Sequence, residues 1–69
     1  MEQRLSKRER QIVHLLVKTA GSNKEIAREL GISDSTVKVQ MRYLMRKLGL
    51  KNRVAVALWA IRKGIEEDD

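Results

Sequence analysis

The stretch that decides the fold is EIARELGIS (residues 25–33), followed at once by DSTVK (residues 34–38). Its first half has apolar residues at helical spacing up to Leu30, and Gly31 follows where helices commonly end in the left-handed conformation. Its second half begins a longer helix whose outer face carries Lys38, Arg42 and Arg46. This order predicts a helix-turn-helix, which presents its second helix to the major groove of DNA.

Helical spacing and capping residues extend this motif to an all-α domain of four helices. We expect these helices at about residues 7–20, 23–30, 34–48 and 53–63. The first two begin with a capping box, in which a serine and the glutamate three residues later satisfy each other's free backbone amides: Ser6 with Glu9, and Ser22 with Glu25. Asn52 is a good N-cap for the fourth helix. A glycine stands after each expected helix: Gly21, Gly31, Gly49 and Gly64.

The third helix is predicted to have one apolar face and one basic face. At 100° per residue, one narrow stripe that should face the core holds Val37, Met41, Leu44 and Leu48. The opposite face holds Ser35, Lys38, Val39, Arg42 and Arg46. One flank between the two faces holds Thr36, Gln40, Tyr43 and Lys47. Basic residues gathered on an outer face suit insertion into a groove.

The fourth helix is apolar almost all round between residues 54 and 61. One of its two apolar stripes is formed by Val56, Trp59 and Ala60. The other is formed by Val54, Ala57, Leu58 and Ile61. Since only one stripe can face the core, the other is a sizeable exposed patch unless another chain covers it. We therefore expect a two-fold homodimer through the second of these stripes.

Composition limits the classes of protein and of binding site that we expect. Sixty-nine residues predict a single domain over residues 1–69 with one small core. With no cysteine and one histidine, and no recognisable nucleophile–base pair, we expect neither an enzyme nor a metal, cofactor or small-molecule site. No apolar run is long enough to cross a membrane and no signal peptide is visible, so a cytoplasmic protein is expected.

The charge balance points to a polyanionic partner. The chain has 15 Lys and Arg against 9 Asp and Glu, a net charge of +6, although four of the acids stand in the terminal run at residues 66–69. Only 3% of residues are aromatic, too few for the stacking platforms of single-strand and RNA binders. Composition therefore favours double-stranded DNA.

Five segments in order resemble the LuxR/NarL/FixJ/GerE-type helix-turn-helix. They are LSKRE (5–9), NKEIA (23–27), IS (32–33), STVK (35–38) and KLGLKNR (47–53). The resemblance covers residues 5–64 and implies a bacterial transcription regulator domain, often the output domain of a response regulator in a two-component system and sometimes a stand-alone protein. It also implies dimers on inverted repeats, with the third helix as the recognition helix and the fourth at the dimer contact. RNA polymerase is a further candidate partner.

The resemblance also implies roles for individual residues. The base-reading positions match Lys38, Val39 and Arg42; lysine and arginine can donate to guanine, and valine can pack on a thymine methyl. The candidates for phosphate contacts are Asn23, Lys24, Ser35, Thr36, Gln40, Tyr43, Arg46 and Lys47. Tyr43 has an equal alternative, in which its ring packs on the edge of the core. The chain departs from the family at residues 19–22, where the link is one residue longer, and at Gln40, where histidine or asparagine is common.

Two other functions stay open at this stage. A sigma-factor C-terminal domain shares the beginning of the first helix and the central motif, but it normally ends soon after the recognition helix. The apolar fourth helix and the acidic ending argue against it. A protein-interaction module could instead use the fourth helix to hold a different partner, and such a module should lack salt-dependent affinity for duplex DNA.

Overall fold

The computed structural model describes residues 5–19 and 22–64 of the 69-residue chain. This part is all-α, with four helices: α1 (Lys7–Thr19), α2 (Asn23–Leu30), α3 (Asp34–Leu48) and α4 (Arg53–Lys63). These bounds confirm the predicted helices. The predicted end of the first helix near Ala20, its glycine stop Gly21 and the acidic run at residues 66–69 lie outside the described residues.

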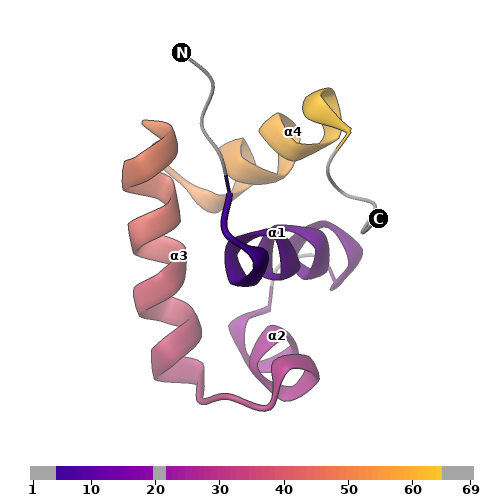
Figure 1. Ribbon diagram of the computed structural model, residues 1–69, viewed down its shortest axis with the longest axis vertical. Helices are drawn as coiled ribbons and strands as arrows, with labels where there is room; N and C mark the ends of the chain where they lie inside the picture. The colour runs from indigo at the N-terminus through magenta and orange to yellow at the C-terminus, as the bar shows by residue number, and fades with distance from the viewer. Residues whose placement is uncertain (1–4, 20–21, 65–69) are drawn as a thin grey trace.

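The helices are arranged around α1. Figure 1 shows α1 in the middle, with α2 on one side, α4 on the other, and the long α3 running past all three. Contacts follow this arrangement, since α1 packs against each of the other helices and α3 packs against both α2 and α4. The outer side of α3 is therefore left free of the bundle.

Each helix begins at a side chain that caps its free amides. The capping box of α1 is confirmed, because Ser6 N donates to Glu9 Oε1 at 2.8 Å and Glu9 N donates to Ser6 Oγ at 3.1 Å. The same kind of bond begins the other three helices: Glu25 N to Ser22 Oγ at 3.3 Å, Thr36 N to Ser33 Oγ at 3.0 Å and Ala55 N to Asn52 Oδ1 at 2.8 Å.

The turn between α2 and α3 depends on Gly31. Its φ of 69° lies in the left-handed region that residues with a Cβ rarely adopt. In this conformation Ile32 N reaches back to Ala27 O at 3.0 Å and closes the end of α2. Ile32 then packs against the core, so α3 begins at a fixed position relative to α2.

All four helices contribute to one apolar core. Its buried members are Ile12, Val13, Leu15, Leu16, Ile26, Ala27, Val37, Met41, Leu44, Val56 and Ala60. The predicted inner stripe of α3 is confirmed, with three buried members and Leu48 partly buried against them. On α4 the stripe that faces the core is the one with Val56 and Ala60, and Trp59 packs at its edge.

Candidate nucleic-acid interface

The outer face of α3 is exposed along its length. Its members are the five residues predicted from helical spacing: Ser35, Lys38, Val39, Arg42 and Arg46. Val39 is 60% exposed although it is aliphatic. It stands beside Lys38 and one turn before Arg42, so two cations and one apolar side chain share a single surface. That combination can donate hydrogen bonds to base edges and pack on a thymine methyl group.

The flank of α3 is more heterogeneous than helical spacing indicated. Thr36 takes part in the N-cap, since its hydroxyl lies 2.9 Å from Ser33 Oγ. Gln40 is partly buried, and its Oε1 is buried without a hydrogen-bond partner in the described structure. Tyr43 is 68% exposed, so most of its ring is uncovered rather than packed on the core. Tyr43 and Lys47 are the exposed residues of this flank, whereas Thr36 and Gln40 are partly buried.

Lys47 is joined to the beginning of α1. Its Nζ donates to Glu9 Oε1 at 2.8 Å, an ion pair between residues 38 positions apart. Burial of Glu9 acts to raise the pKa of its carboxyl, but the hydrogen bonds from Lys47 and Ser6 outweigh it and the pKa is lowered. Because the pKa of Glu9 is lower in the folded chain than in the unfolded chain, the ion pair stabilises the fold at pH values above the unfolded pKa. This stabilisation is lost as the pH falls through the pKa of the folded chain.

The beginning of α2 brings Asn23 and Lys24 to the surface next to free backbone amides. Lys24 is exposed, whereas Asn23 is partly buried and accepts a hydrogen bond at its Oδ1 from Arg53 Nη1 at 2.7 Å. A guanidinium only donates, so this bond fixes the Asn23 amide with its oxygen towards Arg53. The Nδ2 group is then the Asn23 donor for a phosphate at this helix N-terminus.

Arg53 is a residue of this site that the sequence analysis gave no role. It is the first residue of α4 and ties that helix to the beginning of α2. Burial lowers the pKa of its guanidinium, although arginine remains charged in proteins. Its only sequence signal is its place in the KLGLKNR segment, which says nothing about a partner 30 residues away.

The stripe of α4 formed by Val54, Ala57, Leu58 and Ile61, which we call the α4 stripe, is the one that lies on the surface. Val54, Leu58 and Ile61 are 65%, 51% and 52% exposed, and Ala57 between them is partly buried. The three large side chains follow one another at intervals of four and three residues, so they form one face of the helix. Exposed aliphatic groups arranged in a row are typical of a surface that contacts another protein.

No group of three or more His, Cys, Asp or Glu side chains that could hold a metal ion occurs in residues 5–19 and 22–64. In the same part of the chain, none of the helices has the length and apolar character needed to span a bilayer.

Comparison with known proteins assigns the chain to a family. The family model described as "Bacterial regulatory proteins, luxR family" matches residues 3–60. The chain belongs to this family. The LuxR-type helix-turn-helix is thereby confirmed, and with it DNA binding in transcription regulation. The family is one of regulators rather than a class of enzymes, and its match favours this assignment over a sigma-factor domain.

Two relatives of this luxR-family chain are named as a response regulator and as a regulatory protein. The nitrate/nitrite response regulator protein NarL of Escherichia coli strain K12 is 43% identical over 61 residues, which are 88% of this chain and 28% of NarL. The oxygen regulatory protein NreC of Staphylococcus aureus strain JH9 is 43% identical over 63 residues, 91% of this chain and 29% of NreC. The chain therefore spans less than a third of the length of these curated relatives.

Proposed function

We propose that this luxR-family domain binds a specific double-stranded DNA site as a homodimer, with α3 of each copy in the major groove. The site is an inverted repeat, and the domain acts in the cytoplasm as the output domain of a response regulator or as a stand-alone regulator. The observation that carries the proposal is the exposed surface formed by Lys38, Val39 and Arg42, opposite the buried stripe of the same helix.

The residues form two groups: base readers, which contact base edges, and residues that contact phosphates. Lys38 and Arg42 donate to guanine O6 and N7, and Val39 packs on a thymine methyl group. Sequence-independent affinity comes from phosphate contacts that release counterions. The residues proposed for these contacts are Asn23, Lys24, Ser35, Thr36, Gln40, Tyr43, Arg46 and Lys47. The beginning of α2 adds free amides and the positive end of a helix dipole.

The α4 stripe supports the dimer. Two copies that meet through Val54, Ala57, Leu58 and Ile61 are related by a two-fold axis, because the same patch serves both. That axis gives the two recognition helices opposite directions, which matches the two halves of an inverted repeat. Half-sites about one helical turn apart, roughly 34–36 Å, are then within reach of both copies.

Selection of bound sequences from random duplexes tests the proposal most directly. We expect an enriched, symmetric site, and light scattering of the complex should give two copies of the chain per duplex. A protein-interaction module is the second candidate, because the α4 stripe fits a different partner as well as a twin. A chain with no salt-dependent affinity for any duplex would remove the first candidate and favour the second.

Loss of a reader should change specificity. We expect Lys38→Ala or Arg42→Ala to weaken the selected site by about 1–3 kcal/mol and to relax the preference at one base pair. Binding is measured on a series of duplexes in which each base pair is changed in turn. Lys18→Ala is the control, since it removes an exposed cation from the end of α1. An equal loss on all scrambled duplexes contradicts base reading by that residue.

Loss of Lys47 should affect all duplexes alike. If Lys47 contacts a phosphate, Lys47→Ala lowers the slope of log affinity against log salt by about one unit for each bound copy. Glu9→Gln is the matched control, because glutamine preserves the capping box while the charge that holds Lys47 is removed. An unchanged slope in Lys47→Ala would show that this lysine serves only Glu9.

A further inference from the structure

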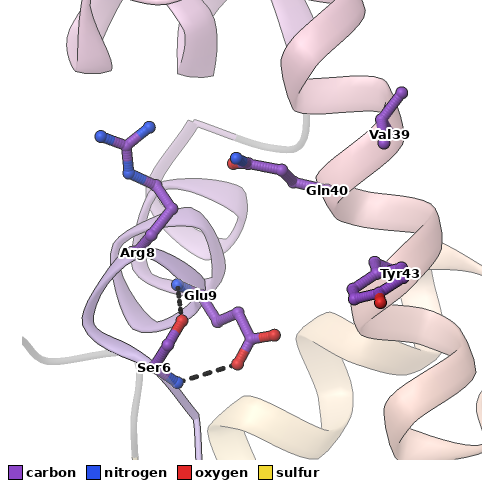
Figure 2. Close-up of a pocket in the computed structure, with 6 residues that line it drawn as sticks. All are labelled: Ser6, Arg8, Glu9, Val39, Gln40 and Tyr43. Carbon is purple, nitrogen blue, oxygen red and sulfur yellow. Dashed lines mark hydrogen bonds between the residues drawn. The ribbon is translucent and has the colours of Figure 1, made fainter.

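A cleft of about 300 Å³ lies between the beginning of α1 and the flank of α3. Figure 2 shows its six lining residues: Ser6, Arg8 and Glu9 from the beginning of α1, and Val39, Gln40 and Tyr43 from α3. The three from α3 are a proposed base reader and two proposed phosphate contacts. The cleft is therefore continuous with the surface that faces DNA in the proposed complex.

Arg8 is the cation of this cleft. It is the second residue of α1 and partly exposed, and its side chain makes no hydrogen bond or ion pair within the described structure. Its neighbour Glu9 accepts hydrogen bonds from Ser6 N and Lys47 Nζ at Oε1, and its ion pair is with Lys47 rather than with Arg8. The guanidinium is thus available to an anion from outside the chain.

Gln40 supplies the second observation. Its side chain reaches from α3 towards the first turn of α1 (Figure 2), and its Oε1 is buried without a partner. A buried carbonyl oxygen that accepts no hydrogen bond is unfavourable, so a donor that enters the cleft and bonds to Gln40 Oε1 removes this cost. Arg8 lines the same cleft and has five N–H donors in a planar fork. It can therefore serve Gln40 and a phosphate together.

We propose that this cleft holds the sugar–phosphate backbone of the DNA strand beside the major groove, with Arg8 on a phosphate and Gln40 positioning the guanidinium. The inference rests on the proposed function and extends the DNA interface to α1. The exposed ring of Tyr43 offers an apolar surface to the deoxyribose ring. A small apolar ligand is the competing occupant, but it leaves Arg8 without an anion.

The first test is the salt dependence of Arg8→Ala on the selected duplex. We expect the slope of log affinity against log salt to fall by about one unit for each bound copy, and by the same amount on scrambled duplexes. Lys18→Ala removes the same charge from the other end of α1 and should keep the wild-type slope. Arg8→Lys should restore the slope but not the full affinity, because a lysine lacks the planar fork.

The second test places the contact on the DNA. Neutral methylphosphonate linkages are introduced one at a time along the selected duplex, and wild type and Arg8→Ala are titrated against each. We expect one position per half-site whose neutralisation weakens the wild type but not Arg8→Ala. Thermal unfolding of Arg8→Ala should match the wild type, which separates a lost contact from a damaged fold.

The results of these tests can contradict the proposed backbone contact at the cleft without contradicting the proposed DNA binding. If Arg8→Ala keeps the affinity and slope of Lys18→Ala while Lys38→Ala still weakens the selected site, the cleft does not hold DNA and the proposed function stands. Methylphosphonate effects that are identical in wild type and Arg8→Ala lead to the same conclusion. If the wild type binds no duplex, both proposals fall.

Discussion

Leu44→Ala should leave the domain largely unfolded at room temperature. Leu44 is completely buried on the inner stripe of α3 and belongs to the core that all four helices share. Truncation of such a leucine costs about 2–5 kcal/mol, from lost burial and from the cavity left behind. A core of this size rarely supplies more than about 3–5 kcal/mol of net stability. The two quantities are comparable, so helix content by circular dichroism and the urea midpoint should both fall steeply.

The control for this substitution lies on the same helix. Val39→Ala also shortens an aliphatic side chain of α3, but on the exposed face, so its unfolding free energy should stay within about 0.5 kcal/mol of the wild type. Saturating duplex should partly refold Leu44→Ala, because a ligand that binds only the native state stabilises it. A cooperative transition near the wild-type midpoint in Leu44→Ala would mean that α3 does not pack as described.

The features that sequence reasoning found are those set by local geometry. The capping bonds join residues three positions apart, as at Ser6 and Glu9, and the glycine stop at Gly31 depends on one backbone conformation. The two faces of α3 follow from the helical period alone, which is why Leu44 was assigned to the core and Lys38 to the surface. Each of these features depends only on residues that are close together in the sequence.

The features that it missed depend on how the helices cross. The pairs Lys47–Glu9 and Arg53–Asn23 join residues 38 and 30 positions apart, and neither has a periodic or local signal. Gln40 was placed on the flank of α3, but the period does not tell that its side chain reaches towards α1 and that its oxygen is buried. These contacts require the orientation of α1 against α3, which the packing of the whole core determines.

Ile61→Glu should separate the dimer without unfolding the domain. Ile61 is exposed on the α4 stripe, so a glutamate there remains solvated in the single chain. In the proposed dimer the same carboxylate is buried against an apolar surface of the twin, where an unpaired charge is costly. Loss of the second copy removes the gain from simultaneous binding to two half-sites, which is about a hundredfold to ten-thousandfold. Light scattering should then find one copy per duplex.

Two comparisons show whether the dimer is the cause. Lys63→Ala lowers the net charge by one unit, as Ile61→Glu does, but by removing an exposed cation of the last turn of α4 outside the stripe, and it should keep two copies on the full site. On a duplex with a single half-site, Ile61→Glu should bind as tightly as the wild type, because only one copy is engaged there. If Ile61→Glu instead keeps wild-type affinity and two copies on the inverted repeat, the copies meet through another surface, and the α4 stripe belongs to a different partner.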